Sequence, residues 1–376
     1  MNNKILIFFF ILVFVFILIL PKKKPNEIKE FFEISNYNLD KYFNKELDKS
    51  YPKYDIKKDC IFVSIASYRD DECSDTITSM INNSENSKNI FIGICSQNNI
   101  KESNEECIPK NGLSKDFIHS NIRIIQFQHT DALGPNYARY ICSHLWRGEE
   151  FFLQIDSHLK FIKNWDKILK DMYYKLPSDK SILTHYPPTD EQLNDTNKIP
   201  YTCSAHYENN FHIISEAQII ERDNNNLRTP YFSAGFFLAK ATFLYDVPYD
   251  PFLPYLFQGE EVLMAARLYT CGYDMYNLTQ SVASHNYDRD DKPRFWNDNS
   301  HKNWQEVQTE SNKRYYKIMN LGTEIHPRFQ YNIEKYGLGK IRSIDDYFNF
   351  TGINPKEKKI VTRCDKRFDF DKNQWV

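Results

Sequence analysis

The tripeptide Asp156-Ser157-His158 has the residue types and the spacing of a divalent-cation site. It directly follows the apolar run 151–155, whose composition predicts a buried strand. Side chains two residues apart on an extended segment point the same way, so Asp156 and His158 can reach one ion together. A carboxylate and an imidazole suit a borderline cation such as Mn²⁺, with Mg²⁺ as the alternative. From these residues alone, a turn followed by a surface histidine explains the pattern equally well.

Four further clusters carry side chains that could serve the same site. They are Ser67-Tyr68-Arg69-Asp70, Gly134-Pro135-Asn136-Tyr137-Ala138-Arg139, Phe257-Gln258-Gly259-Glu260-Glu261 and His285-Asn286-Tyr287-Asp288-Arg289. The first follows a predicted strand and could hold a nucleotide base and ribose. The fourth follows another predicted strand, where His285 could supply a third metal ligand. An ordinary charged loop and a structural histidine are the alternative interpretations.

The second and third clusters each place a glycine before a predicted helix start. Free N–H groups and the positive end of the helix dipole favour anions there. Arg139, about one turn into its helix, could therefore reach a phosphate or a carboxylate. Glu260 or Glu261 could orient an acceptor hydroxyl or take its proton. A helix cap with a surface arginine, and an acidic pair that only stabilises a helix start, remain the alternatives.

The elements that must position these clusters alternate along the chain from Cys60 onward. Buried strands are predicted at 61–66, 90–96, 122–127, 151–155, 181–185, 232–239 and 281–285, and helices at 136–146, at 260–270 and from 303 onward. Continuous apolar strands that alternate with helices predict an α/β fold around a mainly parallel, buried sheet. Ligands gather at the carboxyl ends of such strands, where the segments 67–70 and 156–158 both fall.

Composition excludes some classes of function. The chain has 376 residues, 26% of them charged, and a formal net charge of -2, so it lacks the basic excess of a nucleic-acid-binding protein. Its eight cysteines are scattered, which excludes a zinc knuckle and a small disulfide scaffold but leaves disulfides and free thiols open. No P-loop or GxGxxG motif occurs, and Gly337-Leu338-Gly339 lacks the helix context of a dinucleotide site.

Residues 5–20 form an uninterrupted apolar segment that is followed by Pro21 and three lysines. As a helix the segment would span about 24 Å, slightly less than the roughly 30 Å of a bilayer core. No small-residue cleavage site follows, so we predict a single-pass membrane anchor at 1–24, a stem at 25–59, a globular domain at 60–355 and a tail at 356–376. The lysines favour a cytosolic domain, whereas sequons at Asn82, Asn194, Asn277 and Asn349 favour the ER or Golgi lumen. The topology stays open.

Taken in order, these segments resemble the polypeptide N-acetylglucosaminyltransferases, glycosyltransferase family sixty. The resemblance runs from about Cys60 to Asn354. It rests on Val63-Ser64-Ile65-Ala66-Ser67-Tyr68-Arg69-Asp70, Gly134-Pro135 with Ala138-Arg139, Trp146-Arg147-Gly148-Glu149, Gln154-Ile155-Asp156-Ser157-His158, Leu183-Thr184-His185-Tyr186-Pro187, Pro248-Tyr249-Asp250-Pro251, Gly259-Glu260-Glu261 and Tyr336-Gly337-Leu338-Gly339. Members attach GlcNAc to hydroxyproline of a cytoplasmic ubiquitin-ligase adaptor or to Thr of mucin-like proteins. The tripeptide is also similar to that of the mucin-type polypeptide GalNAc-transferases, in which a later histidine completes the metal site.

The resemblance implies a GT-A fold, a UDP-sugar donor, a divalent cation and retention of the α-anomeric configuration. It implies metal ligands at Asp156, His158 and His285, catalytic acids at Glu260 and Glu261, and nucleotide-sugar contacts from Ser67, Arg69, Asp70, Arg139, Gln154 and Asp156. The predicted activity is transfer of GlcNAc from UDP-GlcNAc to a protein hydroxyl of hydroxyproline, Thr or Ser. Another UDP-sugar donor, a glycan acceptor and an inactive membrane-bound lectin-like module are the alternatives. The predicted anchor departs from the soluble, cytosolic adaptor-modifying members and leaves the acceptor open.

Overall fold

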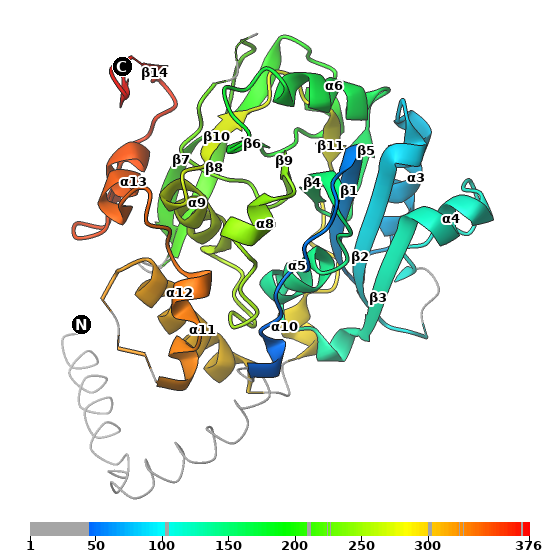
Figure 1. Ribbon diagram of the computed structural model, residues 1–376, viewed down its shortest axis with the longest axis horizontal. Coiled ribbons are helices and arrows are strands. Elements are labelled where there is room, and N and C mark those ends of the chain that lie inside the picture. Colours follow the sequence, from blue (N-terminus) through cyan, green and yellow to red (C-terminus); the bar gives the residue numbers. More distant parts are fainter. Residues whose placement is uncertain are drawn as a thin grey trace, which may run out of the picture. The chain divides into compact units, whose positions relative to one another are not determined.

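The computed structural model describes residues 45–376, except 102–104, 209–211, 224, 226, 300–302, 323, 326 and 370. A seven-stranded sheet organises this part, in the order β10-β6-β9-β4-β1-β2-β3 (Figure 1). Neighbouring strands run parallel except on the two sides of β9, which is antiparallel to β4 and to β6. The α/β class with a mixed, mainly parallel sheet is therefore confirmed.

Most of the predicted strands and helices are present. The strands of the large sheet are β1 (Lys57–Tyr68), β2 (Ile90–Asn98), β3 (Ile122–Gln128), β4 (Glu149–Ile155), β6 (Ser181–Thr184), β9 (Phe236–Lys240) and β10 (Asp274–Asn277). The paired shorter strands are β5 (Leu159–Phe161) with β11 (Ala283–His285), β7 (Lys198–Glu208) with β8 (His212–Glu221), β12 (Ile353–Asn354) with β13 (Lys359–Ile360), and β14 (Phe368–Asp369) with β15 (Gln374–Trp375). The run predicted as a strand from 232 begins as β9 only at Phe236, because residues before it form a turn.

The helices connect these strands and cover the sheet. They are α3 (Cys73–Asn83), α4 (Lys115–Asn121), α5 (Pro135–Ser143), α6 (Trp165–Tyr173), α7 (Asp190–Leu193), α8 (Phe243–Asp246), α9 (Glu260–Thr270), α10 (Phe295–Asp298), α11 (Trp304–Ile318), α12 (Ile333–Tyr336) and α13 (Ile344–Thr351), with short 3₁₀ turns at η1 (Lys45–Leu47), η2 (Ser87–Asn89), η4 (His129–Asp131) and η5 (Pro327–Gln330). α9 has the predicted bounds, whereas α5 ends three residues before the predicted end at 146.

Alternate residues of the central strands enter two separate hydrophobic clusters. Phe62 and Phe152 belong to a cluster that includes side chains of α9, α11 and α13. Val63 and Leu153, the next residue of each strand, belong to a cluster that includes side chains of α3 and α6. Each fully buried phenylalanine contributes about 2–3 kcal/mol to stability. Burial on both faces explains why the strands appear in the sequence as continuous apolar runs.

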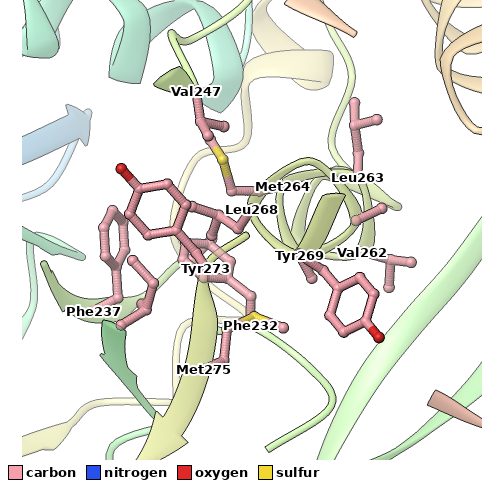
Figure 2. Close-up of a cluster of buried hydrophobic side chains, with 14 of the residues drawn as sticks. Phe232, Phe237, Val247, Val262, Leu263, Met264, Leu268, Tyr269, Tyr273 and Met275 are labelled. Atoms are coloured by element: carbon pink, nitrogen blue, oxygen red, sulfur yellow. The ribbon is translucent and has the colours of Figure 1, made fainter. Parts of the chain in front are cut away.

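Helix α9 is packed over most of its length, which fixes the position of its first turn. Figure 2 shows part of the cluster around it, where Met264 and Leu268 lie on α9 one turn apart. Phe237 of β9 and Met275 of β10 belong to the same cluster and are fully or almost fully buried. This packing fixes where the acidic residues at the start of α9 lie in the fold.

The packed unit extends beyond the boundaries predicted at 59/60 and 355/356. The Tyr51 and Ser143 hydroxyls form a hydrogen bond at 2.7 Å, and the Tyr54 ring packs edge-on against Trp146. This part of the predicted stem therefore belongs to the fold. At the other end, the Trp375 indole N–H donates to the Phe350 carbonyl at 2.7 Å. The observed boundaries differ from the predicted ones because aromatic side chains in these otherwise polar segments pack against residues that only the folded chain brings near them.

The predicted membrane anchor at 1–24 and the first part of the predicted stem lie outside the described residues. Within residues 45–376 as described, no helix has both the length and the apolar character needed to cross a membrane. Two disulfides join distant segments, Cys73 with Cys107 and Cys203 with Cys364. The first ties the start of α3 to the loop after β2, and the second ties β7 to the C-terminal segment. The cysteine count alone left both pairings open.

Candidate active site

A cavity of about 500 Å³ opens at the carboxyl ends of β1 and β4. The starts of α5 and α9 and the end of β11 also line it, so five elements converge there. Of the residues predicted to act, those that line the cavity are Asp70, Arg139, Asp156, His158, Glu260, Glu261 and His285. Ser67, Arg69 and Gln154, predicted to contact the nucleotide-sugar, do not line it.

Asp156, His158 and His285 each offer one ligand atom, and these three atoms lie within 4.8 Å of one another. The Asp156 Oδ2 atom lies 3.3 Å from Nε2 of His285, and the two imidazole rings are 4.5 Å apart. β11 is paired with β5, where Leu159 opposes His285, so the sheet itself brings the third ligand to the tripeptide. One carboxylate and two imidazoles form a donor set that suits Mn²⁺. The residues therefore fit the predicted cation.

Asp70 orients His158. Its Oδ2 atom lies 2.8 Å from Nδ1 of His158 and accepts from the Ser157 hydroxyl at 2.5 Å, while Oδ1 accepts from Arg289 at 3.1 Å. With a proton on Nδ1 pointing at this carboxylate, Nε2 of His158 keeps a free lone pair for a metal. Burial would raise the pKa of Asp70, but hydrogen bonds and the charges of His158 and Arg289 lower it. The lowered pKa of Asp70 favours its ionised form, which in turn favours the His158 tautomer that leaves Nε2 free.

Asp70 also belongs to a second acidic group, with Asp71 and Glu72. Cationic side chains neutralise this group. Arg289 contacts Asp70 and Glu72, and the Lys292 ammonium donates to Asp71 at 3.0 Å. The Asp156 cluster differs because two of its three members are histidines, whereas all three members of this group are acidic.

Arg139 links Asp156 to the acidic pair of α9. Its guanidinium forms an ion pair with Glu260 and lies 3.3 Å from Oδ1 of Asp156. Burial raises the pKa of Glu260 to about 7, although the positive charge of Arg139 opposes the change. Burial likewise favours neutral Asp156, but the hydrogen bond with His285 and the charge of Arg139 hold its pKa well below the usual range. Arg139 therefore faces one permanent anion and one carboxyl group that titrates near neutrality.

Glu261 is held by donors from three different segments. Its Oε1 atom accepts from the backbone N–H of Ala234 at 2.8 Å, and Oε2 accepts from the hydroxyls of Ser215, at 2.8 Å, and Tyr186. Gly259 precedes the acidic pair with φ +85°, a left-handed conformation that favours glycine. Helix α9 can thus begin at the cavity with both carboxylates directed to protein partners.

Of the three predicted residues that do not line the cavity, Arg69 and Gln154 have side-chain partners elsewhere. Arg69 pairs with Glu105 at 2.9 Å and with Asp298 at 3.0 Å. The Gln154 amide donates to the Ala234 carbonyl at 2.6 Å. Ser67 is fully buried at the end of β1. Position at a strand end predicted that these residues would be near the site, but not which way their side chains point.

Several residues around the cavity were not assigned a role from sequence. Tyr287 is 51% exposed and its ring lies 4.1 Å from that of His285. Phe257, 48% exposed, packs edge-on against Trp296 at 5.6 Å, so aromatic rings form part of the cavity wall. Tyr287 and Phe257 belong to the predicted clusters, and their aromatic side chains could have suggested that they line the site. Nothing in the sequence near Trp296 suggested such a position, because only the folded chain brings it to the cavity.

No curated protein matches the chain. Among solved structures, it is similar to GalNAc-T7 with UDP, GalNAc and Mn²⁺ at 12% identity and a TM-score of 0.49, over 87% of this chain and only 65% of that chain. It is also similar to residues 1–349 of S. aureus TarS in complex with UDP-GlcNAc, at 12% identity and a TM-score of 0.40, over 69% of this chain and 73% of that one.

The sequence itself carries the stronger relationship. The profile of the family described as glycosyltransferase (GlcNAc) matches residues 60–115 and 101–357. These ranges include all five sequence clusters that meet at the cavity. The chain therefore belongs to the glycosyltransferase (GlcNAc) family.

Proposed function

We propose that this protein is a divalent-metal-dependent, retaining glycosyltransferase with a GT-A fold, which transfers GlcNAc from UDP-GlcNAc to a hydroxyl of hydroxyproline, Thr or Ser in a protein. The observation that carries the proposal is the cluster of Asp156, His158 and His285, whose ligand atoms lie within 4.8 Å of one another in the main cavity. Membership of a glycosyltransferase family supplies the reaction class.

Asp156, His158 and His285 would hold a divalent cation in this cavity. When bound, such a cation would supply positive charge to stabilise the diphosphate leaving group. Asp156 stays ionised because His285 and Arg139 stabilise its charge. His158 is fixed by Asp70, so it offers Nε2 without a change of tautomer. The chain thus prepares the ligand set before the donor binds.

Arg139 and Glu260 act next to this ligand set. The guanidinium adds a fixed positive charge beside Asp156, which stabilises the departing diphosphate. Glu260 pairs with the same guanidinium at the start of α9 and positions the sugar or the acceptor hydroxyl. Retention requires that the acceptor arrive on the face that UDP leaves. No side chain is assigned as a covalent nucleophile, and we favour direct attack by the acceptor on that face.

UDP release with UDP-GlcNAc, Mn²⁺ and peptides that contain hydroxyproline, Thr or Ser tests the proposal directly. We expect Mn²⁺-dependent release that at least one peptide accelerates, together with a mass increase of one GlcNAc on that peptide. His285→Ala should lose the Mn²⁺ dependence. Metal-independent release at the wild-type rate in both proteins would refute the assignment.

The same assay separates the alternatives. A panel of UDP-sugars distinguishes a GlcNAc transferase from one with another donor, because only the true donor supports fast release. Oligosaccharide acceptors in place of peptides detect a glycan transferase. An inactive lectin-like module would bind sugars without metal-dependent turnover, and the intact ligand set speaks against it.

We also propose that the catalytic domain works in an oxidising compartment, the lumen of the ER or Golgi. The two disulfides support this location, because disulfides persist in secretory compartments and are rare in the cytosol. The sequon asparagines Asn194 and Asn349 are exposed, which suits glycosylation, whereas Asn277 is 1% exposed. Denatured but unreduced protein should have four free thiols among its eight cysteines. Treatment with a glycosidase should increase the mobility of the protein on a gel. Eight free thiols in protein isolated with alkylation would place the domain in the cytosol.

A further inference from the structure

We infer that Glu261 is a positioning residue for the metal ligand Asp156, acting through the turn Ala234-Gly235, and that it does not exchange a proton with the substrate. The inference deepens the proposed function, because it rests on the assignment of Asp156 to the cation. Sequence reasoning placed Glu261 with Glu260 as a catalytic acid, and the contacts of the two side chains now separate them.

Both oxygens of Glu261 are already engaged by the protein. Oε1 accepts the Ala234 N–H at 2.8 Å, and Oε2 accepts the Ser215 hydroxyl at 2.8 Å and the Tyr186 hydroxyl. Three of the roughly four acceptor positions of this carboxyl group are therefore occupied by protein donors. A general base must present an open position to the proton that it removes, so this arrangement favours support over proton transfer.

Gln154 binds the opposite side of the turn that Glu261 contacts. The Ala234 carbonyl accepts from the Gln154 amide at 2.6 Å, and the Gln154 carbonyl oxygen accepts from the Tyr249 hydroxyl at 2.5 Å. The N–H and the C=O of Ala234 are therefore both bound by buried or partly buried side chains of other elements. Ala234 cannot shift without breaking one of these bonds.

Gly235 connects this turn to the proposed metal ligand Asp156. Its carbonyl accepts the backbone N–H of Asp156 at 3.1 Å. A Cβ atom added at position 235 would lie 2.8 Å from Oδ2 of Asp156, the oxygen that faces His285. The turn is thus in close contact with the ligand oxygen. Because metal–ligand distances tolerate only about 0.2 Å, a small displacement of this turn changes the site.

The test compares Glu261→Gln and Gly235→Ala with a matched control, Glu149→Gln. Glu149 is fully buried at the opposite end of the strand that leads to Asp156, and it accepts from Lys57 and Arg123. Two measurements are made on each protein. Electron paramagnetic resonance gives the affinity for Mn²⁺ in the presence of UDP, and hydrogen exchange of the metal-free protein gives the protection of the Ala234 and Asp156 amides.

We expect Glu261→Gln to weaken Mn²⁺ binding about 10-fold and Gly235→Ala about 10- to 100-fold, the range seen when groups that support metal ligands are changed. Both variants should also exchange the Ala234 or Asp156 amide faster than wild type without metal. Glu149→Gln should lower the melting temperature but keep wild-type Mn²⁺ affinity, which separates positioning from general destabilisation.

The inference is overturned if Glu261→Gln keeps wild-type Mn²⁺ affinity and amide protection, and especially if it loses turnover at the same time, as a general base would. Failure of the proposed function gives a different result. If wild-type protein binds no Mn²⁺ with UDP, the metal assignment is wrong. The exchange rates of the metal-free variants still decide whether Glu261 fixes the Ala234-Gly235 turn against Asp156.

Discussion

Strand β4 carries acidic residues at both of its ends, and the two ends use them differently. At the amino end, Glu149 pairs with Lys57 at 3.0 Å and with Arg123 at 2.7 Å, and Glu150 pairs with Lys240. The Glu149 side chain is 0% exposed. Burial raises the pKa of Glu149, but its hydrogen bonds to Arg123 and the backbone lower it overall. This end of the strand is a closed structural ion-pair network.

At the carboxyl end, Asp156 meets one arginine and two histidines, and its side chain is 30% exposed toward the cavity. The His285 Nδ1 atom is buried and has no partner among the described residues. Lysine and arginine offer no lone pair to a metal, whereas an imidazole nitrogen does, so the carboxyl end has possible metal ligands beside Asp156 in addition to Arg139. The difference teaches that the partners of an acidic residue, and not its burial alone, separate a structural site from a ligand site.

The largest expected effect is on catalysis. Asp156→Ala should lower kcat/KM for UDP-GlcNAc about 1000-fold, equivalent to about 4 kcal/mol of transition-state stabilisation, because the diphosphate loses its counter-charge. Initial rates of UDP release with Mn²⁺ measure the change. Glu149→Gln is the matched control, and its rate should stay within about 2-fold of wild type at a temperature where it is folded. Similar losses in both variants would erase the functional distinction between the two ends.

Variants at the two ends of β4 should also differ in how much ligands stabilise them. UDP and Mn²⁺ together, each at about 100 times its dissociation constant, should stabilise wild type by about 2.7 kcal/mol or more, because they bind only the folded state. Glu149→Gln should gain the same amount, whereas Asp156→Ala should gain little. Thermal unfolding with and without the ligands measures this. Equal stabilisation of Asp156→Ala by Mn²⁺ would place the cation elsewhere.

In the unliganded protein, the substitution at the amino end of β4 should reduce stability more than the substitution at the carboxyl end. Glu149→Gln should cost about 1–3 kcal/mol of unfolding free energy, because Arg123 and Lys57 lose their buried counter-charge. Asp156→Asn should cost less, since its side chain is partly exposed. Urea unfolding in EDTA compares the two. A larger loss for Asp156→Asn would mean that the carboxyl end is a structural network too.

Local sequence predicted much of this comparison. Apolar runs located β1 to β4, because strands buried on both faces need apolar residues throughout. The spacing of Asp156 and His158 predicted their shared direction, because side chains alternate along an extended chain. His285 was a candidate because it ends a predicted strand and because the family resemblance implies a later histidine ligand. The pairing of β11 with β5 brings it to the tripeptide.

Contacts between distant segments could not be predicted in the same way. Arg289 binds Asp70 across 219 positions of the chain, and Arg69 binds Asp298 across 229. Periodicity reports which face of an element is buried, but not which charged group arrives from another element. The separation of Glu261 from Glu260 has the same cause, since Tyr186 and Ser215 come from elsewhere in the fold.

The smallest expected effect, and the most specific, is the pH dependence of stability in the metal-free protein. The pKa of Glu149 lies below its usual range in the folded state, so its stabilisation is present above about pH 4.3 and is lost as the pH falls. The pKa of Glu260 is raised from 4.5 to about 7, so its contribution is greatest below about pH 4.3 and is lost as the pH rises through 7. Glu149 at the amino end of β4 and Glu260 at the start of α9, beside the carboxyl end of β4, thus give opposite slopes.

Urea midpoints between pH 3 and 9 in EDTA resolve these slopes. Glu149→Gln should flatten the acid side of the profile, and Glu260→Gln should flatten the fall between about pH 5 and 8, because each variant removes one titrating carboxyl group. Glu260→Gln weakens the pair with Arg139 at every pH, so the slope and not the absolute stability is the diagnostic quantity. A Glu260→Gln profile that still falls through pH 7 would mean that another group titrates at the cavity, and that Arg139 keeps Glu260 ionised throughout.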